Sequence, residues 1–313
     1  MLARIAHELY WLGRNLARAE FTARAVEAVL QAELQGASDA APGVSFGSGG
    51  LLAMLGDDHG QGNTSRTLGQ LILDRERPES MLASIERARD GARTVRDVIS
   101  AEMWQAINTT ALGLHRAGQP GWGTPAGPFL ASQYIKERTS LIWGIANRSM
   151  LRDEAKCFLD AGGLIEISDM VLRMLHVAMP PTDSPPADGT ALILLQAVGG
   201  FHAYLRAVTA PPNADPVARF LLFERSYPDS VAACVDSLHE VFMVADAGPR
   251  NSKPVLRVSR LAADLDFQRR ALPEGSELTG ICSETRQELG YLDQDVAERY
   301  FAGAAAAGPR GEL

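Results

Sequence analysis

Cysteine is scarce in this sequence, and the cysteines it has are far apart. The chain has three, Cys157, Cys234 and Cys282, which form no CxxC pair and are odd in number. This pattern favours neither a disulfide framework nor a cysteine zinc site, so we expect reduced thiols. The six histidines show no helical metal-ligand spacing either. The sequence therefore predicts no metal and names no cofactor.

An excess of positive charge and a long apolar run are also missing. The chain has 30 Lys and Arg against 38 Asp and Glu, a formal charge of -8, which creates no general attraction for nucleic acid. Its longest apolar candidate, residues 191–205, is interrupted by Gln196 and His202 and falls short of the about 20 residues that cross a membrane. Charged residues within the first twenty argue against a secretory signal. We expect a cytoplasmic protein that binds neither nucleic acid nor membrane.

Familiar catalytic motifs are absent as well. The sequence has no GxGxxG after a strand, no Gly-Lys-Ser/Thr phosphate loop, no GxSxG and no HExxH. Alternating runs of β-branched residues, which would predict strands, are missing too. The sequence thus names no catalytic residue, and whether the protein is an enzyme stays open.

What the sequence does have is apolar residues at helical spacing. The chain of 313 residues is 46% hydrophobic and 22% charged, which is typical of a globular protein with a sizeable core. Apolar residues recur mostly at three- and four-residue steps. They predict an all-α protein with helices over residues 1–34, from Pro78 to Ile99, through Ile135–Ile145, and over 153–178, 190–209, 229–244, 255–272 and 283–301.

An internal repeat is the strongest sign of organisation. Residues 12–24 lie without gaps over residues 161–173, an offset of 149, and residues 71–80 lie over 221–230, an offset of 150. We infer a helical bundle made of two diverged tandem copies of one helical unit in a pseudo-twofold relation, with an N-terminal copy at 1–150 and a C-terminal copy at 151–313. The copies are expected to share one core. Two domains with separate cores are the alternative.

The first helix carries charged residues on the side opposite its apolar stripe. A projection at about 100° per residue puts Leu9 and Leu16 on one face and Trp11, Arg14 and Arg18 on nearly the other. One interpretation is that the arginines form a solvated face. The other is that the helix is packed on both sides, which a large aromatic such as Trp11 favours.

Arginines also recur on the helix after Pro78, and the two sets form our main site hypothesis. At the positions equivalent to Arg14, Arg18, Arg93 and Arg96, the second copy has Gly163, Ile167, Met243 and Asp246, so all four cations are lost. Planar guanidinium groups bind phosphate or carboxylate bidentately. We therefore consider an anion or ligand site in the N-terminal half made of Arg14, Arg18, Arg93 and Arg96 with Trp11. The structural alternative for the helix after Pro78 is that Glu86, Asp90 and Asp97, nearby in sequence, compensate its arginine row of Arg89, Arg93 and Arg96.

A second group of polar residues predicts structure rather than chemistry. Glu20 and Arg24 have the i, i+4 spacing of a helical ion pair. Where the copies meet, we expect a polar network of Arg138, Arg152, Asp153 and Glu154. Asp153 and Glu154 are adjacent and point to different sides of a helix, which argues against acid–base or metal chemistry.

Five stretches of the sequence carry a family resemblance over nearly the whole length: residues 1–24, 92–97, 102–104, 150–154 and 220–231. In these stretches the chain resembles the alpha-E domain family of bacterial helical proteins, named for a Glu-Arg motif. The family's Glu-Arg pair lies over Ala17-Arg18 in the first copy and over Glu166-Ile167 in the second. Each copy therefore keeps only one member of the pair.

The resemblance implies partners. It implies an operon association with a circularly permuted ATP-grasp protein, and often with a transglutaminase-like peptidase, in systems that make or process amide bonds. On that basis we expect a non-catalytic helical partner or substrate-binding subunit of such a system, which binds the ATP-grasp protein and a peptide or small anion. The alternative is an enzyme or anion-binding protein that uses the four arginines.

Overall fold

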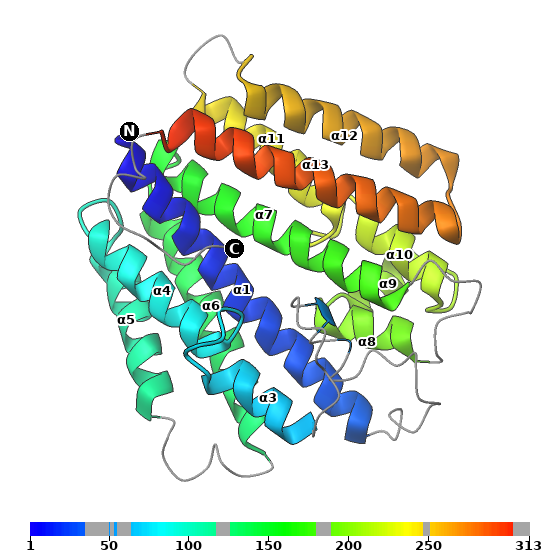
Figure 1. The fold of residues 1–313 in the computed structure, drawn as a ribbon, viewed down its shortest axis with the longest axis horizontal. Coiled ribbons are helices and arrows are strands. Elements are labelled where there is room, and N and C mark those ends of the chain that lie inside the picture. Colours follow the sequence, from blue (N-terminus) through cyan, green and yellow to red (C-terminus); the bar gives the residue numbers. More distant parts are fainter. Residues whose placement is uncertain are drawn as a thin grey trace.

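The computed structural model describes residues 1–34, 50, 53–54, 64–116, 126–179, 189–246 and 251–302. These residues form helices and no strand (Figure 1), which confirms the predicted all-α class. The helices are α1 (Ala3–Leu34), α3 (Thr64–Leu73), α4 (Met81–Thr94), α5 (Ala101–Arg116), α6 (Gly127–Ser149), α7 (Glu154–Ala178), α8 (Thr190–Ala197), α9 (Phe201–Ala207), α10 (Ala214–Phe223), α11 (Val231–Ala245), α12 (Lys253–Ala271) and α13 (Ser276–Tyr300).

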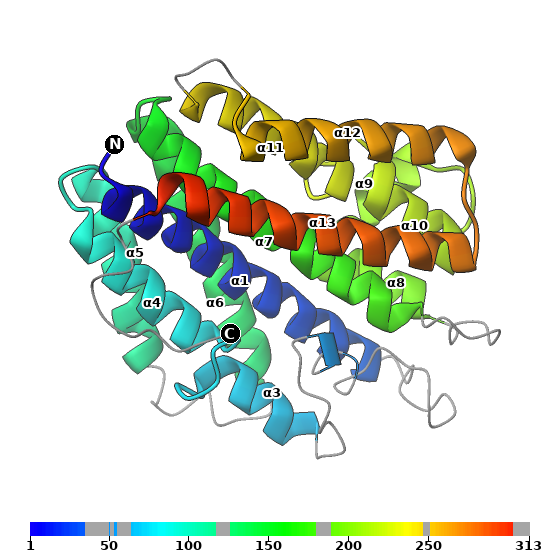
Figure 2. The ribbon, with the colours of Figure 1, turned by 45° about the horizontal axis from the view of Figure 1, so that its top comes forward.

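Two long helices, α1 and α7, lie side by side at the centre and run in the same direction (Figures 1 and 2). Helices α4 and α6 pack against α1, and α5 lies beyond them. Helices α11 and α13 pack against α7, and α12 lies beyond them. The central pair is therefore covered by one group of helices from each half of the sequence.

Glycine allows the two central helices to touch. A Cβ added to Gly13 would lie 2.0 Å from the carbonyl oxygen of Leu159, and one added to Gly162 would lie 1.9 Å from that of Tyr10. No real Cβ tolerates such contacts, so each backbone packs directly on the other at these two points. The close contact also brings polar side chains of α1 within reach of α7.

One continuous cluster of buried apolar side chains runs through both halves of the chain. It extends from Ala6 on α1 to Phe301 after α13, and it includes at least one residue of each described helix from α1 to α13. Helices of the two halves thus contribute to the same apolar interior. None of the described helices carries the long uncharged stretch that crossing a bilayer requires.

Several expected helix boundaries are confirmed, and others are wrong. Helices α1 and α7 match the predictions closely. Helix α4 begins after Ser80, whose Oγ accepts a hydrogen bond from the Ala83 amide at 3.0 Å, and it ends at Thr94 rather than at Ile99. Pro78 lies in the turn before the helix rather than in its first turn. Ser80 is the N-cap instead, because its hydroxyl can accept from a free helical amide and a proline side chain cannot.

The predicted helix over 190–209 is two helices. Helices α8 and α9 are separated at Gly199, whose φ of +69° lies in the left-handed region. A Cβ there would lie 2.4 Å from Nη1 of Arg24, so the break lets the chain pass close to α1. Helices α3, α5 and α10 were not predicted, and α13 begins at Ser276 rather than at 283.

Candidate functional site

A buried carboxylate from α7 lies at the centre of the main polar cluster. The Glu166 side chain is 1% exposed. Its Oε2 accepts from Nε of Arg14 at 2.8 Å and from Nη2 of Arg18 at 3.0 Å, while its Oε1 accepts from Nε of Arg18 at 2.5 Å. Both oxygens are therefore paired with guanidinium groups of α1.

Arg14 extends this cluster to a third helix. Its Nη1 donates to Oδ2 of Asp293 on α13 at 2.9 Å, and the Tyr10 hydroxyl donates to the other oxygen of Asp293. The Arg14 guanidinium also lies 4.9 Å from the ring centroid of Trp11, within cation–π range. Arg14 and Trp11 are thus together, as expected, and α1 is packed on both sides.

The charges in this cluster keep Glu166 ionised and Arg14 protonated at neutral pH. Burial alone would raise the pKa of Glu166, but the charges of Arg18 and Arg14 outweigh it and lower that pKa to about 2. Burial likewise opposes the charge on Arg14, yet the Glu166 carboxylate raises the pKa of Arg14 well above its ordinary value. Burial, and then the charge of Asp293, raises the pKa of Tyr10. At neutral pH these groups are not poised to exchange protons.

The structure adds an arginine that sequence reasoning missed. Nε of Arg87, on α4, donates to Oδ1 of Asn15 at 3.0 Å, and its Nη2 donates to the Pro78 carbonyl and, at 3.4 Å, to Oγ of Ser84. All of these acceptors are uncharged. Burial, and then the nearby charge of Arg18, lowers the pKa of Arg87. The sequence did contain a sign of Arg87. The residue 150 positions later is Ser237, so this cation, like Arg14 and Arg18, has no counterpart in the second half.

The structure does not bring Arg93 and Arg96 to this cluster, so the four-arginine site is not assembled. Both are exposed, and the Arg96 guanidinium lies 4.9 Å from the ring centroid of Trp104. Helix α4 runs antiparallel to α1, with Arg87 beside Asn15 and Gly91 beside Glu8. Residues beyond Gly91 therefore lie toward the start of α1, away from Arg14 and Arg18.

The predicted ion pair on the first helix is confirmed. Nη2 of Arg24 lies 2.8 Å from Oε1 of Glu20. On α7, Nε of Arg173 lies 2.8 Å from Oδ2 of Asp169, so the two central helices carry the same brace 149 positions apart. These pairs hold side chains along a single helix rather than forming a binding site.

The polar network predicted where the halves meet is not formed as one unit. Arg138 instead donates to α5, to Oγ1 of Thr110 at 3.0 Å. Asp153 caps α7 by accepting from the backbone amides at its start, and Glu154 accepts from the N-terminal amine at 2.8 Å. Arg152 is exposed. Asp153 is used as the N-cap of α7, where its carboxylate accepts from backbone N–H groups that have no partner within the helix, so it is not part of a network with Arg138.

The arginine–carboxylate contact joins the two retained members of the Glu-Arg pair. Arg18 comes from the first of the two aligned segments and Glu166 from the second, and they bond across the α1–α7 interface. The corresponding positions, Ala17 and Ile167, are apolar. Similarly, a Cβ on Gly163, the counterpart of Arg14, would lie 3.0 Å from the Trp143 side chain. One side of the interface is charged and the other apolar.

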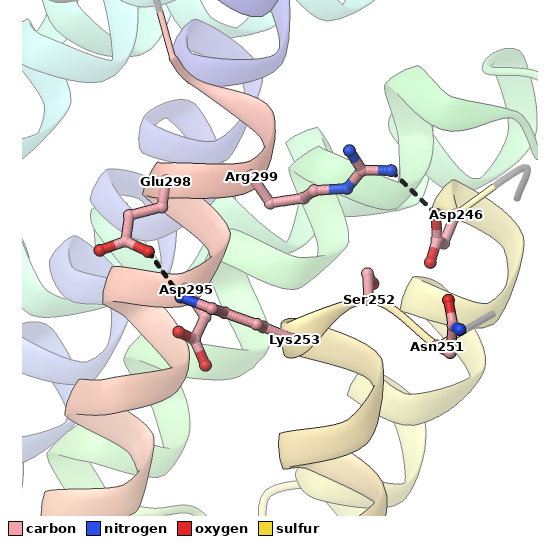
Figure 3. A pocket seen from close by; sticks show the side chains of 7 residues that line it. All are labelled: Asp246, Asn251, Ser252, Lys253, Asp295, Glu298 and Arg299. Carbon is pink, nitrogen blue, oxygen red and sulfur yellow. Dashed lines mark hydrogen bonds and ion pairs between the residues drawn. The ribbon is translucent and has the colours of Figure 1, made fainter. Parts of the chain in front are cut away.

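Figure 3 shows a second polar site. It is a pocket of about 470 Å³ near the start of α12 and the end of α13. Its charges pair with one another: Arg299 with Asp246 at 3.5 Å and Lys253 with Glu298 at 3.2 Å. Asp295 pairs with Arg257 at 2.6 Å. Because these charges are compensated, the pocket is a weaker candidate than the cluster at Glu166.

Nucleophiles and metal ligands give no competing site in the part of the chain that the structure describes. Burial raises the pKa of Cys157 to about 11 and those of Cys234 and Cys282 to about 12. Over the same residues, no group of three or more His, Cys, Asp or Glu side chains is placed to hold a metal ion.

The fold and the cluster define the class: an all-helical bundle whose two central helices are joined by a buried arginine–carboxylate cluster. The chain belongs to the Alpha-E family, described as a predicted alpha-helical domain with a conserved ER motif, whose model matches residues 1–301.

Similar proteins occur in mycobacteria. Uncharacterized proteins of Mycobacterium bovis and Mycobacterium tuberculosis are 25% identical over 310 residues, and another from Mycobacterium tuberculosis is 24% identical. Each alignment covers 92% of this chain but 34% of the relative, so the chain spans about a third of the length of these relatives. No solved structure matches.

Proposed function

We propose that this protein is a non-catalytic helical partner of an ATP-grasp-type system that forms amide or peptide bonds, and that it binds the ligase or its peptide substrate. The observation that carries the proposal is the length of the mycobacterial relatives. They contain a matching unit within a chain about three times as long. A unit that is covalently joined to other segments in relatives commonly works beside them.

The states of the Glu166 carboxylate and of two buried thiols support a non-catalytic role. Glu166 is ionised and saturated by two arginines, and the buried thiols of Cys234 and Cys282 have pKa values near 12, far above neutral pH. A general base or nucleophile needs a pKa near the working pH and a free face toward the substrate. These groups meet neither condition.

Exposed apolar side chains on α12 provide the surface that we assign to the ligase. Leu256 is 58% exposed and Phe267 is 70% exposed, and they share the outer side of this helix. The outer side of α5, which follows α4 as α12 follows α11, carries the polar residues Gln105 and Thr109 and a less exposed apolar residue, Leu112, at 42%. Large exposed apolar side chains grouped on one helix are typical of protein-binding surfaces.

Co-expression with the circularly permuted ATP-grasp protein of the same genome tests this function. We expect the two proteins to elute together in size-exclusion chromatography. The F267D variant should lose the complex, whereas L205D, which changes a comparably exposed leucine on α9, should keep it. A chain that stays alone and leaves ligase activity unchanged would overturn the proposal.

We also infer that the bundle consists of two diverged tandem copies in a pseudo-twofold relation, with units at 1–150 and 151–313 that share one core. The support is reciprocal: Gly13 packs on Leu159, while Gly162 packs on Tyr10, the counterpart of Leu159. The caps agree as well, because Ser80 and Ser230 each accept from the amide three residues later. An experimental structure should superpose the two units by a half-turn in this register; any other register would contradict duplication.

A further inference from the structure

Three guanidinium groups around Glu166 keep one nitrogen each without a partner. Nη2 of Arg14, Nη1 of Arg18 and Nη1 of Arg87 make no hydrogen bond with any described residue. The side chains of Arg14 and Arg18 are 10% and 19% exposed and Arg87 is half-buried, so the cluster lies at the edge of the bundle rather than wholly inside it. The cluster therefore presents unused N–H donors at its surface.

The three arginines also converge on one part of α1. Arg14 and Arg18 are one helical turn apart and share Glu166. Arg87 is held from α4 by Asn15, which adjoins Arg14 in sequence and lies three residues before Arg18. Side chains three or four residues apart share a helix face, so Arg87 and Arg18 approach the same surface of α1.

One arginine of this cluster has no carboxylate bonded to it directly. Three arginines face two carboxylates, Glu166 and Asp293, and Arg87 forms no ion pair with any described residue. Glu79 and Glu86 lie near enough to favour the charge on Arg87, but neither pairs with it, and Glu86 is bonded to Arg75 at 2.9 Å. Arg87 therefore has carboxylates at a distance but none bonded to it, and its neighbour Arg18 carries a like charge, which favours a directly bound anion.

We propose that Arg87, Arg18 and Arg14 form a binding site for a small oxyanion, either the carboxylate of a peptide or a phosphate. The Arg18 side chain is 19% exposed, so an anion can reach it without opening the bundle. Arg87 is the residue that completes the site, because its hydrogen bonds go only to uncharged groups and its charge is available. This site goes beyond the partner role, since it can be occupied without a ligase.

Isothermal titration calorimetry on the full chain, at constant ionic strength, tests the site with three probes: inorganic phosphate, trialanine and trialanine amide. Binding of phosphate alone identifies a phosphate site. Binding of trialanine but not of its amide identifies a carboxylate site. If no probe binds at millimolar concentration, or if the amide binds as well as trialanine, the proposal is overturned.

Substitutions then locate the site. R87Q should weaken binding roughly tenfold, because one charge-assisted contact is lost. R93Q changes an exposed arginine on the same helix and should leave the affinity within about twofold. Equal effects of R87Q and R93Q would show general charge attraction and contradict the proposal.

A labelling experiment on the wild-type chain avoids any question of variant folding. Phenylglyoxal modifies arginines, and peptide mass spectrometry reports each site. The bound probe should protect Arg87 and Arg18 but not Arg93. Protection of all three, or of none, would overturn the site even where the titration shows binding. Neither experiment involves the ligase, so a failure here is distinguishable from a failure of the partner role.

Discussion

At the residue scale, Glu166 determines how the polar cluster is organised. A buried carboxylate loses its hydration, which is costly, and two arginines with matching geometry offset that cost. The pair contributes less to net stability than its short distances suggest, because the arginines lose hydration too. Its stronger effect is on register, since only one alignment of α1 and α7 places Arg14 and Arg18 on the same carboxylate.

The first prediction concerns the loss of this carboxylate. E166Q removes the negative charge but leaves two guanidinium groups facing each other across a neutral amide. Breaking a buried pair on one side typically costs about 3–5 kcal/mol. We expect the free energy of unfolding at neutral pH to fall by roughly that amount, measured by urea denaturation. E284Q, at an exposed carboxylate, is the control and should match wild type.

The second prediction concerns pH. The pKa of Glu166 is about 2 in the folded chain, below its ordinary value of 4.5. A depressed carboxyl pKa stabilises the fold above pH 4.5, and this contribution is lost as the pH falls from about 4.5 to about 2. It is on the order of 3 kcal/mol at neutral pH. Unfolding free energies measured over this range should fall less steeply for E166Q than for wild type.

A parallel acid profile for E166Q and wild type would contradict the assignment. It would mean that Glu166 has the same pKa, and so binds the same number of protons, in the folded and unfolded chains. E284Q again serves as the control, and it should show the wild-type slope.

At the element scale, the contact of α1 with α7 depends on two glycines. Gly13 and Gly162 leave no room for a side chain, so each helix has one position where its neighbour's backbone takes the place of Cβ. Helix axes normally lie about 8–10 Å apart, a spacing set by the side chains between them. Removing those side chains brings Arg14 and Arg18 close enough to bond Glu166 directly.

The third prediction tests this contact. In G13A the new Cβ would lie 2.0 Å from a backbone oxygen, so the helices must separate. We expect a loss of about 3 kcal/mol in unfolding free energy, at the upper end of overpacking costs. The control is G144A, on the exposed side of α6, where nothing lies within 4 Å. It should stabilise the chain by about 0.5–1 kcal/mol, because alanine favours a helix interior over glycine.

The two central helices were predicted closely because they are long, although α5 was missed despite its 16 residues. The 32 residues of α1 and the 25 of α7 give a periodic signal over many turns. Helices α3 and α10 have ten residues each, too few for periodicity to stand out. The break at Gly199 was missed although the sequence contains a local signal, because two adjacent glycines weaken a helix and Gly199 adopts a left-handed φ of +69°.

At the scale of the whole molecule, the apolar interior joins both halves. A single cluster of buried side chains includes residues of α1 and α4 as well as α7 and α11. Two separate cores, the alternative raised by the repeat, would leave α1 and α7 with a thin polar boundary instead of this shared interior.

The fourth prediction follows from the shared interior. Scanning calorimetry should record one cooperative transition, with the calorimetric enthalpy close to the van't Hoff enthalpy. G13A should lower the temperature of that single transition. Two resolved transitions, only one of them shifted by G13A, would mean that the units unfold independently and would contradict a common core.

The candidate site shows the same division between local and tertiary information. Charge on the far side of the first helix, and its loss in the aligned second segment, pointed to Arg14 and Arg18. Their partner Glu166 lies about 150 residues away, and no spacing rule connects them. Arg93 and Arg96 were grouped with them because sequence does not reveal the antiparallel direction of α4.

By itself, the sequence determined the helical class, the long helices, the aligned windows and the positions of the charges, because these follow from periodicity and residue type along one chain. The tertiary structure decided which charges meet. Pairing depends on how closely α1 and α7 approach and on the direction of α4, and both are set by packing between residues far apart in sequence. Hence Arg87 joined the cluster, while Arg93 and Arg96 remained exposed.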